Sequence, residues 1–245
     1  MMETILEIKD LAKSFGKMRV LENIGFTIKK GEIVGLLGLN GEGKTTLIRS
    51  IMGVIPFERG AVFYKGAPLS FKSGKQKINI AYVPEDSFFY SGMTLREHLR
   101  LNASFYPSSN QKRHLELATE FELSLTQKIG ALSRGQKLKL ALVMALAAEP
   151  DLLLLDDATS GLDVPTRKEF LRGIIRDYTD RGASVLFATH LVHEIEGLVD
   201  RILILHQGRI LVDENIQVLK DKVKPDESPS LEDIFTGIVG RREVQ

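Results

Sequence analysis

The sequence predicts an α/β fold, in which a largely parallel sheet carries helices on its faces. Three observations support this. Short apolar segments alternate along the chain with stretches at helical spacing. Leu152–Leu155 is a continuous apolar run bounded by polar residues, as expected of a strand buried on both faces. A glycine-rich loop joins another apolar segment, Ile33–Leu37, directly to a helical stretch that starts with Leu47.

The expected strands of the fold share a short, apolar character, and they are Ile5–Ile8, Ile33–Leu37, Ile80–Val83, Leu152–Leu155, Val185–Ala188 and Ile202–Leu205. The N-terminal part differs from the rest. Ile5–Ile8 and Val20–Ile28 alternate apolar and polar residues, which predicts an antiparallel β layer.

A helical lobe is expected from about Thr94 to Ala148, between the strands Ile80–Val83 and Leu152–Leu155. The chain after Asp221 has the composition of a linker, and Leu231–Phe235 is expected to be a short amphipathic helix behind a serine cap. We therefore expect a single domain over residues 1–245, with a core (about 1–86 and 150–220), a helical subdomain (about 87–149) and a C-terminal tail (about 221–245).

Composition excludes several classes of function. A net charge of +1, with interspersed charges, supplies no basic field, so no nucleic-acid partner is expected. The absence of cysteine excludes disulfides, thiolate metal sites and cysteine catalysis. We expect no signal peptide before Gly16, and no apolar run is long enough to span a bilayer. A role at a membrane would then require a partner.

The loop after Leu37 reads Gly-Leu-Asn-Gly-Glu-Gly-Lys-Thr-Thr and fits the phosphate-binding pattern G-x-x-x-x-G-K-[ST] in its required context of strand, loop and helix. We expect its glycines to let the backbone turn through conformations closed to other residues, so that successive N–H groups point at an anion; these glycines are Gly38, Gly41 and Gly43. The loop predicts a nucleoside triphosphate ligand.

Within the loop, Lys44 is expected to reach the β and γ phosphates, and Thr45 to offer its hydroxyl to Mg²⁺. Asn40 and Thr46 belong to the same expected binding segment. Glu42 must point away from the phosphates, because its charge would repel them.

Acidic residues and a histidine follow two of the expected strands. Asp156 ends the run Leu152–Leu155, where it could hold Mg²⁺ through water, and Asp157 could accept a hydrogen bond from the attacking water. The alternative is a strand that ends in solvated acids. His190 follows Val185–Ala188, where a hydrogen bond to the γ-phosphate is favoured over the structural role that a lone histidine usually has.

The sequence Leu132-Ser133-Arg134-Gly135-Gln136 precedes a long expected helix, Lys137–Ala148. Ser133 can simply cap that helix. A serine hydroxyl, a glycine amide and a helix N-terminus together can also form a second phosphate-binding surface. Both interpretations are open at this point.

These segments together resemble the ATP-binding-cassette ATPases in order and approximate spacing, from Leu6 to Leu211; the matching segments are Gly38–Thr46, Leu132–Gln136, Leu152–Asp157, Ser160–Asp163 and His190. The Leu-Ser-x-Gly-Gln phrase is the most specific of them. The resemblance implies a RecA-like P-loop NTPase core, an N-terminal antiparallel β layer and an inserted helical subdomain.

The resemblance also implies that two cassettes, identical or homologous, dimerise head to tail with ATP and Mg²⁺ between them. One subunit would supply Lys44, Thr45, Asp156 and His190, and Phe15 would stack on adenine. The other subunit would supply the segment Ser133, Gly135 and Gln136, and Asp163 belongs to the implied binding set.

Two departures refine the comparison. Asp157 stands where the family usually has glutamate, and its carboxylate is one methylene shorter, so part of a contribution of about 10²–10⁴-fold to the rate is at risk. The pair Pro84-Glu85 and the tail Ser230–Phe235 look like an exporter branch of bacteria and archaea. In that branch Glu85 would sense the metal and the attacking water, and Ser87–Arg96 would touch the permease.

The expected protein is therefore the ATPase subunit of an exporter, cytoplasmic and held at the inner face of the membrane by separate permease subunits. One alternative is a regulatory ATP switch outside transport, with little or no hydrolysis because of Asp157. Another is an asymmetric pair, in which a different cassette supplies the missing glutamate.

Overall fold

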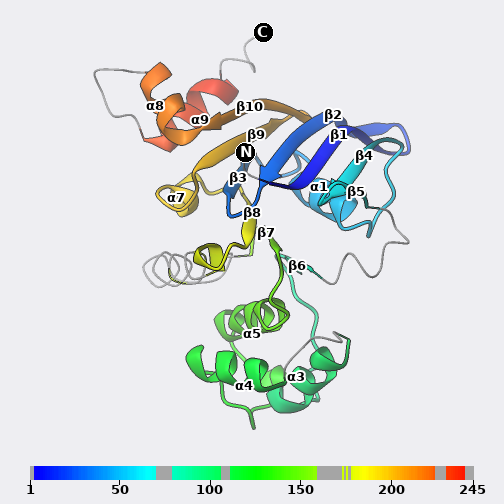
Figure 1. Cartoon of the computed structure of the whole chain (residues 1–245), viewed down its shortest axis with the longest axis vertical. Coiled ribbons are helices and arrows are strands. Elements are labelled where there is room, and N and C mark those ends of the chain that lie inside the picture. Colours follow the sequence, from blue (N-terminus) through cyan, green and yellow to red (C-terminus); the bar gives the residue numbers. More distant parts are fainter. Residues whose placement is uncertain are drawn as a thin grey trace.

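The computed structural model describes residues 3–69, 79–105, 111–158, 173, 175, 178–223 and 230–240. Its central element is a six-stranded sheet with the order β10-β9-β3-β8-β7-β6, in which only β9 and β10 pair antiparallel (Figure 1). The strands are β3 (Ile33–Leu37), β6 (Ile80–Val83), β7 (Leu152–Asp156), β8 (Ser184–Thr189), β9 (Arg201–His206) and β10 (Arg209–Asn215). The predicted parallel core is confirmed.

A second, four-stranded sheet is antiparallel and has the order β2-β1-β4-β5. Its strands are β1 (Thr4–Phe15), β2 (Met18–Lys29), β4 (Arg59–Tyr64) and β5 (Ala67–Pro68). The predicted N-terminal layer is therefore present, and Ile5–Ile8 belongs to it as part of β1. The sequence analysis did not predict β4, β5 or β10.

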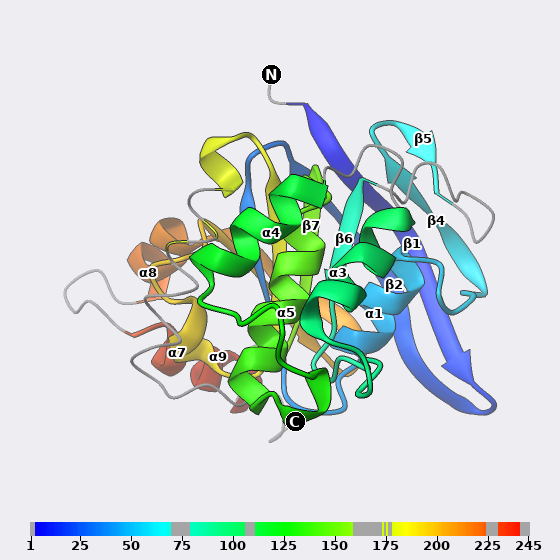
Figure 2. The same cartoon turned by 90° about the horizontal axis from the view of Figure 1, so that it is seen from below.

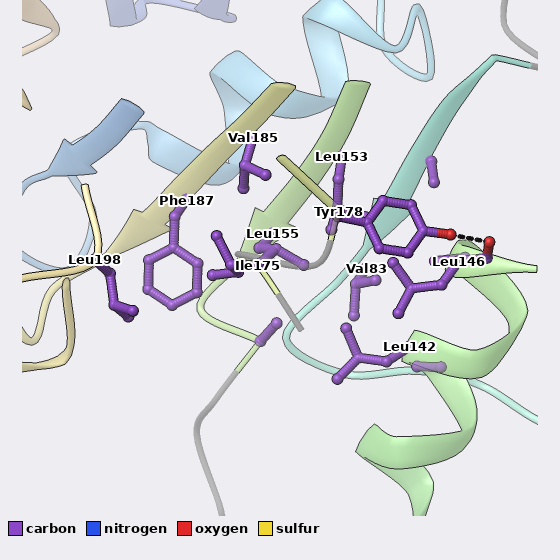
Figure 3. Close-up of a cluster of buried hydrophobic side chains, with 14 of the residues drawn as sticks. Val83, Leu142, Leu146, Leu153, Leu155, Ile175, Tyr178, Val185, Phe187 and Leu198 are labelled. Atoms are coloured by element: carbon purple, nitrogen blue, oxygen red, sulfur yellow. Dashed lines mark hydrogen bonds between the residues drawn. The ribbon is translucent and has the colours of Figure 1, made fainter. Parts of the chain in front are cut away.

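Alternation along the central strands builds a hydrophobic core on each face of the sheet. On β7, Leu153 and Leu155 face one cluster, and Leu152 and Leu154 face the other, beneath the antiparallel sheet; all four are fully buried. Figure 3 shows part of the first cluster, where the Tyr178 hydroxyl donates a hydrogen bond to the carbonyl oxygen of Leu146. Each buried leucine contributes roughly 1.5–3 kcal/mol, so both faces hold β7 in place.

The chain between β6 and β7 is helical, as predicted, and its helices lie at one end of the molecule, in front of the sheet in Figure 2. They are α3 (Leu95–Ser104), α4 (Gln111–Glu120), the 3₁₀ turn η1 (Ile129–Ala131) and α5 (Arg134–Leu146). Helix α5 begins at Arg134, three residues before the predicted start, because the Ser133 hydroxyl accepts a hydrogen bond from the Gln136 amide.

The C-terminal part adds α7 (Val192–Ile195), α8 (Ile216–Val223) and α9 (Leu231–Gly240). Ser230 caps α9 as predicted, and the helix continues past Phe235 to Gly240. The Glu196 carboxylate accepts hydrogen bonds from the Leu231 amide (3.3 Å) and Lys220 Nζ (2.9 Å). This carboxylate ties α8 and α9 to the chain just after α7. The sequence analysis did not predict α8.

Candidate active site

The glycine-rich loop leaves the C-terminal end of β3 and enters α1 (Lys44–Ile51). Gly41 and Gly43 adopt φ values of 84° and 102°, which confirms the prediction that the backbone turns through conformations that favour glycine. The prediction is wrong for Gly38, because the φ angle of this residue is not positive. A Cβ atom there would lie 2.7 Å from the Leu205 carbonyl oxygen, so Gly38 is required by close approach of two backbones.

Lys44 is the first residue of α1, and its side chain is buried against the loop. Its Nζ donates hydrogen bonds to the carbonyl oxygens of Gly38 (2.9 Å) and Leu39 (3.2 Å) and lies 3.7 Å from Asp157 Oδ2. Burial lowers the pKa of Lys44, and the charges of Asp157 and Asp156 oppose this shift. An ammonium group has three donors, so two carbonyl bonds leave one N–H for an anion at the loop.

Asp156 ends β7 and is only 1% exposed. The Thr45 hydroxyl donates to its Oδ1 (2.9 Å), and the Tyr82 hydroxyl donates to its Oδ2 (3.0 Å). Burial raises the pKa of Asp156, and these two hydrogen bonds oppose the rise. The structure thus brings together Thr45 and Asp156, two of the three residues that the sequence predicts for Mg²⁺; the third, Glu85, forms no contact with them in the described part of the chain.

A hydroxyl and a carboxylate are hard oxygen donors, which suit Mg²⁺. Nowhere in the described ranges do three or more His, Cys, Asp or Glu side chains form a group that could hold a metal. The donor set fits an ion that takes few protein ligands and completes its shell with water and phosphate oxygens.

Asp157 and His190 also meet, although 33 residues separate them. Asp157 Oδ1 accepts a hydrogen bond from the His190 amide (3.1 Å) and lies 2.9 Å from His190 Nδ1. The Asp157 amide donates to the Ala188 carbonyl (2.8 Å), and the residue has a φ of 43°. The left-handed turn directs the carboxylate of Asp157 toward β8 and Lys44.

Three strands thus deliver the predicted catalytic groups to one edge of the parallel sheet: β3 delivers the loop and Lys44, β7 the aspartate pair, and β8 the histidine. Sites of open α/β sheets form at this carboxyl edge. A family model described as ABC transporter matches residues 21–160, which is more than half of the chain.

The chain belongs to the ATP-binding subunits of ABC transporters. Its sequence is 34% identical over 218 residues to the ABC transporter ATP-binding protein YtrB of Bacillus subtilis (strain 168), a match that covers 89% of this chain and 74% of that protein. It is 30% identical over 214 residues to the SkfA peptide export ATP-binding protein SkfE of the same organism, which covers 85% of this chain and 88% of that protein.

A solved structure described as the ATP binding subunit of an ABC transporter superposes with a TM-score of 0.87 at 33% sequence identity, covering 96% of this chain and 99% of that one. The P-loop NTPase fold and the family resemblance are therefore confirmed. Members of this family of ATPases bind ATP with Mg²⁺ and hydrolyse it in transport.

In this ABC subunit the residues predicted for the partner's nucleotide lie apart from Lys44. Ser133, Gly135 and Gln136 form the N-terminus of α5 in the helical lobe, and Ser133 is exposed. Ser133 and Gln136 complete a reciprocal capping box, since the Ser133 amide also donates to Gln136 Oε1 (3.0 Å). Asp163 lies outside the described residues.

Four further predicted residues form no hydrogen bond or ion pair with Asp156 or Asp157 in the described part of the chain. Phe15 ends β1 and is 51% exposed, with Lys13 Nζ at 4.8 Å from the centre of its ring. Asn40 is exposed on the loop, and Thr46 is half-buried in α1. Glu85 follows β6, is exposed, and forms no hydrogen bond or ion pair within the described part of the chain. Its predicted role stays a prediction.

Sequence reasoning missed two contacts of the site. Tyr82 on β6 supplies the second hydroxyl to Asp156. Glu42 points away from the loop mouth, as expected, and its carboxylate lies 2.9 Å from His206 Nδ1 and accepts a hydrogen bond from the Gln207 amide. The two-residue period of β6 places Tyr82 on one face of that strand, and the register with β7 that brings this face to Asp156 comes only from the tertiary structure.

Proposed function

We propose that this chain is the ATP-hydrolysing subunit of an ABC exporter, in which ATP closes a head-to-tail pair of cassettes and closure moves a separate membrane permease. The observation that carries the proposal is the convergence of five groups at one sheet edge: the Thr45 hydroxyl donates to Asp156, and Asp157 lies against both His190 and Lys44. The alternation of ATP-bound closure and reopening by hydrolysis is a population shift driven by ligand.

Each side chain has a distinct task in this proposal. Lys44 binds the β and γ phosphates, and Thr45 and Asp156 would hold Mg²⁺, which neutralises charge on the phosphates when bound. Asp157 accepts a hydrogen bond from the attacking water, with His190 beside it to bind the γ-phosphate. Asp157 is 8% exposed, so little bulk water surrounds its carboxylate. Glu85 would act as the sensor of metal and attacking water.

The second cassette supplies the other half of the nucleotide contact. Ser133, Gly135 and Gln136 lie at the N-terminus of α5 in the helical lobe, with Ser133 exposed and the other two partly buried, whereas Lys44 lies on α1; in the proposal a second chain presents this surface to the ATP. Asp163 would join the same interface, and Phe15 would stack on adenine. The partner cassette is either identical or homologous.

The permease is proposed to bind near the start of the helical lobe. Phe88 is 97% exposed and Tyr90 is 63% exposed, which is unusual for aromatic side chains. A hollow of about 240 Å³ is lined in part by Phe88, Phe89 and Met144. No helix in the described ranges is long and apolar enough to cross a membrane. We propose a cytoplasmic location at the inner face, through this contact.

SkfE is named for peptide export, and this similarity supports the export direction. The Pro84-Glu85 pair and the tail Ser230–Phe235 support it further, through their resemblance to the exporter branch.

The proposal is tested by the steady-state Mg²⁺-ATPase rate of the purified chain over a range of protein concentrations, with Lys44→Ala protein as the blank. We expect the specific activity to rise with concentration, because each site needs residues of two cassettes. A rate at the blank level at every concentration, with ATP still bound, would instead support the non-hydrolysing switch or a different cassette as the necessary partner.

A further inference from the structure

Asp156 is held by hydroxyl groups on both of its carboxylate oxygens. The Thr45 hydroxyl on α1 donates a hydrogen bond to Oδ1 (2.9 Å), and the Tyr82 hydroxyl on β6 donates one to Oδ2 (3.0 Å). The two donors come from different elements. With both oxygens occupied, the carboxylate has one orientation relative to the glycine-rich loop.

The position of Tyr82 follows from the register of the parallel sheet. Tyr82 pairs with Leu154, two residues before Asp156. Side chains two residues apart on a strand share a face, so Leu154, Asp156 and Tyr82 all lie on the side of the antiparallel layer. A phenol ring is long enough to reach the diagonal neighbour on the adjacent strand.

The Tyr82 hydroxyl is the donor of this hydrogen bond, because an ionised carboxylate only accepts. Removing it would leave one oxygen of a buried carboxylate without a partner.

We propose that Tyr82 is a positioning residue for Mg²⁺-ATP: by holding Oδ2 of Asp156, its hydroxyl presents Oδ1, beside Thr45, to the metal. This inference rests on the proposed Mg²⁺ role of Thr45 and Asp156. Outer-shell hydrogen bonds orient metal-binding side chains, and losing one typically costs about 10–100-fold in metal affinity or activity. Tyr82 itself would not touch the metal or the nucleotide.

A second tyrosine in the same chain offers a matched control. The Tyr64 hydroxyl donates to Asp151 Oδ2 at 2.6 Å, and Asp151 immediately precedes β7 at the opposite edge of the sheet. Tyr64→Phe and Tyr82→Phe therefore each remove one hydroxyl from one aspartate, at the two ends of a single strand. Of the two aspartates, only Asp156 lies beside the glycine-rich loop.

The experiment measures equilibrium binding of a non-hydrolysable ATP analogue by calorimetry, once with Mg²⁺ and once with EDTA. For each protein the ratio of the two dissociation constants gives the gain in affinity from Mg²⁺. We expect Tyr82→Phe to lower this ratio about tenfold, the low end of the range for losing an outer-shell partner. Binding in EDTA should stay unchanged, and Tyr64→Phe should keep the full ratio.

A double-mutant cycle with Asp156→Asn then tests the route of the effect, because Tyr82→Phe should have no further effect on the ratio once the carboxylate is gone. An unchanged ratio in Tyr82→Phe, or an equal loss in Tyr64→Phe, would overturn the role of Tyr82. If the unmodified chain gains no affinity from Mg²⁺, the proposed Mg²⁺ site itself fails. The two failures are therefore distinguishable.

Discussion

Asp157 has a strained backbone, and its carboxylate contacts two other residues. Its φ of 43° lies in the left-handed region, which Asp and Asn tolerate better than other residues with a Cβ atom. One oxygen contacts the amide and Nδ1 of His190, and the other lies 3.7 Å from Lys44 Nζ. The short side chain is therefore anchored close to the backbone. In the proposed mechanism, its reach toward an attacking water is one methylene shorter than that of a glutamate.

For Asp157→Glu we predict an increase in the ATPase turnover rate of about tenfold or more, as a longer carboxylate recovers part of the general-base contribution. The left-handed backbone costs a non-Gly residue without local hydrogen bonds about 1 kcal/mol. This should lower the melting temperature by roughly 2–4 °C. Steady-state turnover and thermal unfolding measure the two effects. Asp157→Asn is the control and should show no turnover; an unchanged rate in Asp157→Glu would contradict this account of Asp157.

At the scale of elements, α3 and α5 begin in the same way. Thr94 and Glu97 form a capping box at α3, and Ser133 and Gln136 form one at α5. Both boxes satisfy backbone N–H groups that the helix leaves without partners. The proposed function gives only the second box another task, the contact with the nucleotide of a partner cassette.

Ser133→Ala and Thr94→Ala are each expected to lower the free energy of unfolding by about 1 kcal/mol, measured by urea denaturation. Ser133→Ala alone should also raise the protein concentration needed for half-maximal specific ATPase activity, because it removes a hydroxyl from the cassette interface. An equal shift of that concentration in Thr94→Ala would show that helix stability, and not a contact with nucleotide, controls activity.

At the scale of the whole molecule, one sheet separates two hydrophobic clusters. Leu153 and Leu154 are adjacent on β7, fully buried, and on opposite faces. The helical lobe and the antiparallel layer therefore depend on the same strand. Loss of packing on either face should weaken β7, and with it the position of Asp156 and Asp157.

Leu153→Ala and Leu154→Ala are each predicted to cost about 2–5 kcal/mol. In both variants, urea unfolding followed by circular dichroism and by tyrosine fluorescence should give one shared transition, since the fluorescence signal includes tyrosines of both clusters, Tyr64 and Tyr178. Val54→Ala, at a side chain that is 57% exposed, is the control and should change stability by less than about 0.5 kcal/mol. Separate transitions for the two probes would mean that the clusters unfold independently.

Those parts of the fold that local residue patterns specify could be predicted from the sequence. Buried parallel strands such as Leu152–Leu155 are continuous apolar runs, and the glycine-rich loop has a fixed order of residue types. By contrast, β4 and β10 mix polar and apolar residues, because each pairs with a longer or more buried strand and is partly exposed. Tertiary pairing stabilises such strands more than their own sequence does.

The sequence by itself determined the chemistry of this protein: a phosphate loop with Lys44 and Thr45, an aspartate pair after an apolar strand, and a capped helix at Ser133. These depend on neighbours within a few residues, so local periodicity and residue type suffice to find them. Only the tertiary structure decided which of the polar side chains contact one another. Tyr82 reaches Asp156 across 74 residues of sequence, and Glu42 reaches His206 across 164. Such contacts depend on the order and register of the strands, which long-range packing selects and no local pattern specifies.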